Sequence, residues 1–166
     1  MAVSDQNLFS IDTGILQKDA CIVIVRTEWN TGIVDKLEQG CRKILDHYEM
    51  SNYKVLNVPG AFEIPFTIKN YWASIQQTFQ KPRAFIALGC VLRGGTPHFD
   101  FVCKAVTDGI LHLNLTIEVP TVFGILTVDS DLQAEERVGG KHGHKGEEAA
   151  ITALKMISLQ QSFYKI

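Results

Sequence analysis

Short apolar runs and amphipathic stretches alternate along most of this chain. Apolar runs rich in β-branched residues predict buried strands at Ala20–Val25, Tyr53–Val58, Ala84–Val91 and Val119–Val128. Apolar residues spaced three or four positions apart predict amphipathic helices between these strands. The helices are expected from about Thr31 to Tyr48, Ala61 to about Ala73, about Asp100 to Leu115, Asp131 to Val138 and about His144 to Ser162.

Strands that alternate with helices predict an α/β fold, with a four-stranded parallel sheet covered by helices on both faces. Residues 1–18 are polar with weak periodicity, so we expect a flexible N-terminal arm followed by a single domain over residues 19–166. Ligands of such folds bind at the carboxyl ends of the strands. The loops expected at that edge are Thr27–Thr31, Pro59–Glu63, Leu92–His98 and Thr127–Asp131.

Composition narrows the class of protein. The 166 residues carry a formal net charge of −2 and no run of basic residues, which argues against nucleic acid or an anionic membrane surface as a partner. No apolar run approaches the roughly 18 residues of a membrane helix, and the first residues do not resemble a signal peptide. Four scattered cysteines fit reduced thiols in a cytoplasmic protein better than a disulfide framework or a metal site.

The loop from Leu92 to His98 carries the most chemistry. Gly94 and Gly95 follow a strand and precede a helix, so their N–H groups could bind a phosphate at the helix N-terminus, although an ordinary tight turn explains them equally well. His98 sits where the loop enters the helix. It could transfer protons near neutral pH, or it could only cap or pack.

The other loops allow two interpretations each. Trp29 could stack on a flat heterocycle or close the core, and Glu63 could bind a ligand or be a solvated charge at a helix start. Arg137 and Lys145 flank a glycine-rich turn, where they form either an exposed basic loop or a pair of cations for an anionic ligand. His142 and His144 are weak metal candidates, and we discount them.

Several motifs together resemble one family. They are Val58-Pro59-Gly60-Ala61-Phe62-Glu63-Ile64-Pro65, Gly94-Gly95-Thr96-Pro97-His98-Phe99-Asp100-Phe101-Val102, Gln133-Ala134-Glu135-Glu136-Arg137-Val138-Gly139-Gly140-Lys141 and Gly143-His144-Lys145-Gly146. In this order, from about Asp19 to Ser162, they resemble the 6,7-dimethyl-8-ribityllumazine synthases of riboflavin biosynthesis. The resemblance implies a flavodoxin-like three-layer α/β/α sandwich. It also implies a transferase that condenses 5-amino-6-(D-ribitylamino)uracil with 3,4-dihydroxy-2-butanone 4-phosphate, releasing phosphate and water.

The resemblance also implies roles for individual residues. His98 matches the proton-transfer histidine. The residues that match the pyrimidine- and ribityl-binding positions are Trp29, Asn30, Ala61, Phe62, Glu63, Val91 and Leu92. Those that match the phosphate-binding positions are Gly95, Thr96 and Arg137. Phe123 and Lys145 match residues that a neighbouring subunit contributes to the site. No metal or organic cofactor is implied.

The chain departs from the commonest family pattern at two positions. Pro97 stands where a hydroxyl residue is frequent and has no N–H to offer a phosphate, and Trp29 stands where phenylalanine is common. The implied assembly is a homopentamer, or a 60-subunit shell of pentamers, with riboflavin synthase as a further partner. An alternative from another class is a flavin- or lumazine-binding protein with little turnover; a flavodoxin-like electron carrier is a remoter one.

Overall fold

The computed structural model of the chain describes residues 19–164. The expected arm at residues 1–18 therefore lies outside the described residues. The elements are β1 (Ile22–Thr27), α1 (Thr31–His47), β2 (Tyr53–Val58), η3 (Ala61–Glu63), α2 (Ile64–Ile75), β3 (Ala84–Leu92), α3 (His98–Thr116), β4 (Thr121–Val128), α4 (Asp131–Glu135), β5 (Val138–Gly140), β6 (Gly143–His144) and α5 (Lys145–Ser162).

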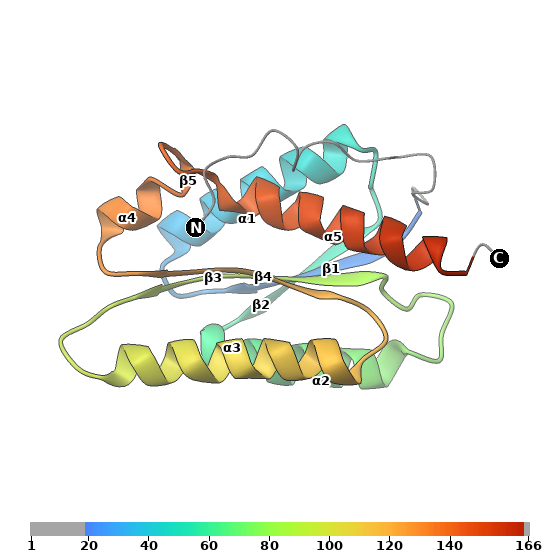
Figure 1. Cartoon of the computed structure of the whole chain (residues 1–166), viewed down its shortest axis with the longest axis horizontal. Helices are drawn as coiled ribbons and strands as arrows, with labels where there is room; N and C mark the ends of the chain where they lie inside the picture. The colour runs from blue at the N-terminus through green and yellow to red at the C-terminus, as the bar shows by residue number, and fades with distance from the viewer. Residues whose placement is uncertain (1–18, 165–166) are drawn as a thin grey trace.

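The four long strands form one parallel sheet in the order β2-β1-β3-β4. Figure 1 shows three layers, with α1, α4 and α5 above the sheet and α2 and α3 below it. This arrangement confirms the predicted flavodoxin-like α/β fold. The carboxyl ends of all four strands meet at one edge, so the loops selected from the sequence do lie together. β4 lies at one end of the strand order and β2 at the other, so no strand of residues 19–164 covers the outer side of β4.

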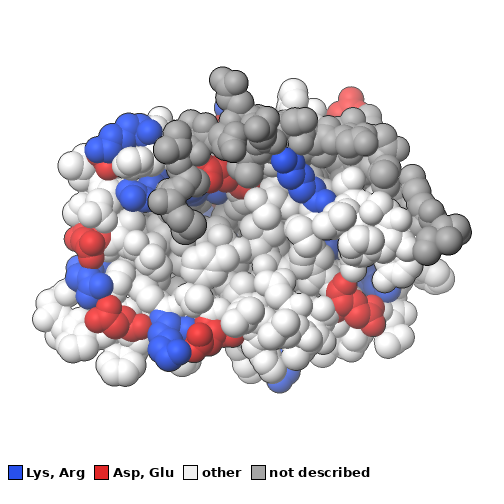
Figure 2. All heavy atoms as spheres, viewed as in Figure 1, with Lys and Arg blue, Asp and Glu red and all other residues white. Residues whose placement is uncertain are grey.

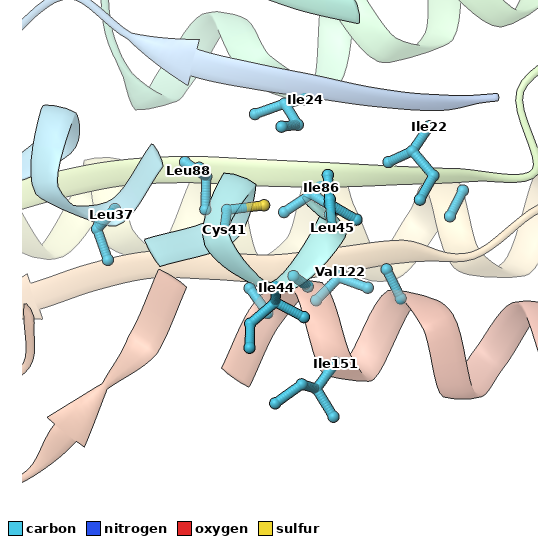
Figure 3. Close-up of a cluster of buried hydrophobic side chains, with 14 of the residues drawn as sticks. Ile22, Ile24, Leu37, Cys41, Ile44, Leu45, Ile86, Leu88, Val122 and Ile151 are labelled. Atoms are coloured by element: carbon cyan, nitrogen blue, oxygen red, sulfur yellow. The ribbon is translucent and has the colours of Figure 1, made fainter. Parts of the chain in front are cut away.

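Burial of the strands on both faces explains their continuous apolar runs. One face packs against α1 and α5, where Ile24 of β1, Leu45 of α1 and Ile151 of α5 are fully buried (Figure 3). The opposite face packs against α2 and α3, around Phe85 and Ile68. The two apolar clusters clamp the sheet from both sides, so the ends of its strands give the loops a rigid base.

The structure corrects several predicted boundaries. β1 runs to Thr27, two residues beyond the prediction, because Arg26 is held in the strand by its ion pairs to Asp35 and Glu38 of α1. The helix expected from Asp131 to Val138 ends at Glu135, and Val138 joins the stretch 139–143, expected to be a loop, and His144 in the hairpin of β5 and β6. Its strands are only three and two residues long and contain glycine, so they carry no alternating pattern.

The cysteines agree with the reduced thiols expected from the sequence, since all four are free. Cys21, Cys41 and Cys90 are buried, whereas Cys103 is partly exposed. Between residues 19 and 164, none of the helices has the length and apolar character needed to span a membrane.

The close approach of α1 and α5 depends on Gly146. A Cβ at this position would overlap the backbone carbonyl of Leu37. We expect Gly146→Ala to destabilise the protein by about 2–4 kcal/mol, because two packed helices must separate. Chemical denaturation measures this loss. Gly32→Ala is the matched control, since a Cβ there meets no atom within 4 Å, and it should not destabilise the protein. Equal stability of the two variants would contradict this packing.

Candidate functional site

The loops at the carboxyl ends of β1, β2 and β3 enclose a cavity of about 490 Å³. Nine of the thirteen predicted site residues line it: Trp29, Asn30, Ala61, Phe62, Glu63, Val91, Leu92, Thr96 and His98. Gly94, which the sequence analysis considered with Gly95 as a phosphate turn, also lines it, and so do five residues to which no role was given: Thr27, Gly60, Cys90, Phe99 and Val102. Thr27, Gly60 and Cys90 lie at or beside strand ends, and Phe99 and Val102 lie in the first turns of α3, so only their nearness to these loops could have identified them.

Trp29 is a wall of this cavity and does not belong to the core, which excludes the core role that the sequence left open. Its side chain is 68% exposed, while its backbone N–H donates to the carbonyl of Pro59 at 3.2 Å. Asn30 adopts a left-handed backbone conformation with φ 58° and donates from Nδ2 to the carbonyl of Cys90 at 2.8 Å. These bonds tie the β1 loop to its neighbours, so the exposed indole is available for stacking on a flat ring.

The loop after β2 forms a second wall. Glu63 Oε2 accepts a hydrogen bond from the N–H of Gly60 at 3.1 Å, and this bond folds the carboxylate back over the start of η3. Ala61 is buried, whereas Phe62 is 62% exposed. The wall thus presents a fixed carboxylate and backbone groups, which suit a ligand rich in hydroxyl groups.

The loop after β3 brings His98 and the glycine turn together. α3 begins at His98, and its 19 residues direct the positive end of the helix at the turn. The N–H of His98 approaches the Thr96 hydroxyl at 3.4 Å, and Gly95 lies exposed between two residues that line the cavity. Pro97 occupies the N-cap position and contributes no N–H. An anion can bind here with an imidazole beside it.

Cys90 is the thiol that lines this cavity. Burial and, to a lesser degree, the negative charge of Asp131 raise the pKa of Cys90 to about 11. The thiol therefore stays protonated near neutral pH and is a poor nucleophile. Cys90 is therefore not a candidate nucleophile for chemistry in this cavity.

Three of the predicted site residues lie elsewhere. Phe123, Arg137 and Lys145 line a separate cavity of about 980 Å³ along the open edge of β4, between α3 and α5. Arg137 therefore does not line the cavity of His98, although both were expected to act on one substrate. Figure 2 shows that the middle of this face is largely uncharged, with ionic side chains around its rim. Exposed apolar residues on and around this face include Phe123, Met156, Leu159 and Phe163.

The two cations of the second cavity are held in place. Arg137 Nη1 donates to the carbonyl of Gln133 at 2.7 Å, and Lys145 Nζ pairs with the carboxylate of Glu148 at 2.7 Å. The N–H of Lys145 donates to the carbonyl of Arg137 at 2.8 Å, so the two backbones are joined. Both residues are only partly exposed. These hydrogen bonds and the partial burial argue against the exposed basic loop that the sequence left open.

His144 directly precedes Lys145 and holds the start of α5 in place. It caps α5 by accepting at Nδ1 from the N–H of Glu147 at 3.4 Å, and its ring fills the space above Gly40 of α1. Among residues 19–164, neither it nor His142 belongs to a group of side chains that could hold a metal ion. Its role in this fold is to anchor the start of α5.

Burial lowers the pKa of His144, with Lys43 acting in the same direction and Glu147 and Glu148 opposing it. The unfolded chain then binds this proton more readily than the fold, so stability falls as the pH drops through the ordinary range of histidine. We expect the unfolding midpoint of the wild type to fall more between about pH 7.5 and pH 5.5 than that of His144→Asn, which keeps a capping side chain. Thermal melts of both proteins measure the difference. Parallel curves would contradict an anchoring role for neutral His144.

Comparisons with known proteins cover almost the whole chain. The profile of the family described as 6,7-dimethyl-8-ribityllumazine synthase matches residues 19–161. Proteins with this name from Parabacteroides distasonis and Porphyromonas gingivalis are 43% and 45% identical over 162 and 161 residues. These alignments cover 95% and 96% of this chain, and 98% and 95% of the relatives. A protein of the same name from Cytophaga hutchinsonii is 41% identical and covers 95% of this chain.

Proposed function

Since the chain belongs to the 6,7-dimethyl-8-ribityllumazine synthase family and is an enzyme of this type, we propose that it condenses 5-amino-6-(D-ribitylamino)uracil with 3,4-dihydroxy-2-butanone 4-phosphate. The products are 6,7-dimethyl-8-ribityllumazine, phosphate and water. The observation that carries this proposal is the cavity in which an exposed indole, a fixed carboxylate and His98 at a helix N-terminus face one space.

Different regions of the cavity suit the pyrimidine ring, the ribityl chain and the phosphate of the two substrates. The pyrimidine ring stacks on Trp29, and its edge meets the backbone of Val91 and Leu92 at the end of β3. The ribityl chain meets Glu63 and the backbone around Ala61, with Phe62 and Asn30 beside it. The phosphate lies at the turn of Gly95 and Thr96, where backbone N–H groups and the positive end of α3 attract an anion.

In this reaction the substrate supplies the nucleophile. Its amine attacks the ketone, so the protein needs no activated serine or cysteine, in agreement with the protonated Cys90. The protein holds the two reactants in register, which can contribute several kcal/mol. His98 moves protons during imine formation, phosphate departure and ring closure. A cationic group facing the phosphate stabilises its departure.

Arg137 does not line the cavity of His98 in its own chain, so we assign that cation to Arg137 of another copy of the chain. It lines the cavity at the β4 edge with Phe123 and Lys145. The open side of β4 and the exposed apolar residues beside it fit an interface with a second copy. We therefore place these three residues in the site of a neighbouring subunit, with Arg137 on the phosphate and Phe123 beside the pyrimidine.

The assembly that joins such sites head to tail is a closed ring. We propose a homopentamer in the cytoplasm, where free thiols such as those of this chain persist, and riboflavin synthase as a partner in the pathway. Only Lys141 and His142 join β5 to β6. Because this turn carries no long insertion that would block shell closure, pentamers remain free to assemble into a 60-subunit shell. Sedimentation velocity of the purified protein distinguishes the ring from the shell.

Mixing the purified protein with both substrates tests the reaction. The lumazine chromophore should appear well above the spontaneous background, with its identity checked by mass spectrometry. A rate equal to the background would reject the enzyme and leave a protein that only binds lumazines or flavins.

A further inference from the structure

Arg93 makes an unusual set of contacts immediately before the glycine turn. Its Nε donates to Asp129 Oδ1 at 2.7 Å, and its Nη2 donates to Asp100 Oδ1 at 3.0 Å. Its guanidinium carbon lies 4.0 Å from the centre of the Phe99 ring. Its backbone N–H donates to the carbonyl of Val128 at 2.9 Å. One side chain thus joins the loop after β4 to the first turn of α3.

The turn that binds phosphate in the proposed function lies between these anchors. Arg93 precedes Gly94, and Asp100 and Phe99 follow His98 directly. Gly94 and Gly95 have open space around them, so no side-chain packing restrains their backbone. The guanidinium fixes both ends of the turn instead. Arg93 lines neither of the two cavities, so it acts through these neighbours and does not itself contact a ligand.

The contacts continue from Asp129 to Arg137. The N–H of Asp129 donates to Gln133 Oε1 at 2.9 Å, and the carbonyl of Gln133 accepts from Arg137 Nη1 at 2.7 Å. The Ser130 hydroxyl caps α4 by accepting from the N–H of Gln133 at 3.3 Å, which keeps this short segment in place. A continuous path of hydrogen bonds therefore leads from Arg93 to the cation at the other cavity.

We infer that Arg93 is a positioning residue that fixes the phosphate turn of its own chain to the segment carrying Arg137, which the chain presents to a neighbouring copy. This inference rests on the proposed function. Each phosphate in the ring meets the turn of one chain and Arg137 of the next. Because Arg93 joins both parts within each chain, it sets the spacing of these groups around the ring.

The alternative is that Arg93 attracts the phosphate by its charge alone. The two roles predict opposite effects on catalysis when the Asp129 carboxylate, which forms an ion pair with the Arg93 guanidinium, is removed. If Arg93 positions the turn as a clamp, removing this carboxylate weakens that contact and slows catalysis. If Arg93 attracts phosphate by its charge, removing it leaves the charge unpaired and does not slow catalysis. Arg93, Asp100 and Asp129 are all exposed, and exposed ion pairs contribute little to stability. The substitutions should therefore act on catalysis and leave the fold in place.

The test compares Arg93→Gln, Asp129→Asn and the double variant. We expect each single change to lower kcat/KM for the phosphate-bearing substrate by about tenfold, because the turn and Arg137 lose their register. The double variant should be no worse than Arg93→Gln alone, since that change already removes the contact with Asp129. KM for the pyrimidine substrate and the unfolding midpoint, within about 2 °C, should stay unchanged. Arg93→Lys should recover only part of the loss, since one ammonium cannot span both carboxylates.

Lys69→Gln is the matched control, because it removes one exposed positive charge from α2. It should behave as the wild type. Unchanged or improved kinetics in Asp129→Asn, with a loss in Arg93→Gln, would overturn the clamp in favour of direct attraction. Unchanged kinetics in both would overturn any role of Arg93 in catalysis.

Hydrogen exchange provides a readout independent of turnover. The amides of residues 94–98 should exchange faster in Arg93→Gln and Asp129→Asn than in the wild type and Lys69→Gln. Equal exchange would contradict the clamp even if the variants were slow enzymes. If the wild type formed no lumazine, the proposed function would fail, and the exchange rates would still decide whether Arg93 holds the turn.

Discussion

His98→Ala is expected to lower kcat by about 10²–10⁴-fold, the usual contribution of a general acid–base group. The residue is exposed at the first position of α3 and lines the cavity beside Thr96. Proton transfers at several steps of the condensation require such a group, whereas substrate binding rests mainly on other residues. We therefore expect KM for both substrates to change much less than kcat. Steady-state kinetics with each substrate varied in turn measures the two effects separately.

The matched control is His112→Ala, which removes an exposed histidine from the same helix. It should retain the wild-type kcat. His98→Ala with an unchanged kcat would remove His98 from the mechanism. An increase in KM alone would reduce its role to binding.

Mixing two inactive variants is expected to restore activity. Chains with His98→Asn keep an intact Arg137, and chains with Arg137→Gln keep an intact His98. In oligomers assembled from equal amounts of both, about one quarter of the sites pair an intact pocket with an intact neighbouring face. Co-expression of the two variants should therefore yield about one quarter of the wild-type activity per site, while each variant alone stays nearly inactive.

The control for this result is the same mixture made from oligomers assembled separately, which should stay inactive unless subunits exchange. A co-expressed mixture as inactive as its parents would contradict a site shared between copies. It would place His98 and Arg137 in one chain or remove Arg137 from catalysis.

Sequence patterns predicted the sheet well because burial on both faces leaves a strong signal. The run from Ala84 to Val91 has no polar interruption, and β3 begins at Ala84 and ends one residue later than predicted. The helical periodicity of α1 is equally clear, since its buried residues Ile33, Leu37, Cys41 and Ile44 recur every three or four positions. In contrast, the hairpin of β5 and β6 depends on glycines and two short strands, so it had no periodicity to detect.

The candidate site was only partly predictable. Loops after parallel strands converge for topological reasons, so the grouping of Trp29, Glu63 and His98 could be expected. The position of Arg137 in a separate cavity from His98 could not be expected, because it depends on the strand order, which puts β4 at one edge of the sheet. Arg93 was overlooked because its role depends on Asp129, 36 residues away in sequence.

A structure of the assembled protein with bound orthophosphate tests the central claim most directly, namely that each site is divided between two copies. The account predicts that the phosphate contacts the turn of Gly95 and Thr96 from one chain and the guanidinium of Arg137 from its neighbour. A phosphate held by the turn and Arg137 of the same chain, or a neighbouring Arg137 out of hydrogen-bonding reach of the phosphate, would contradict it.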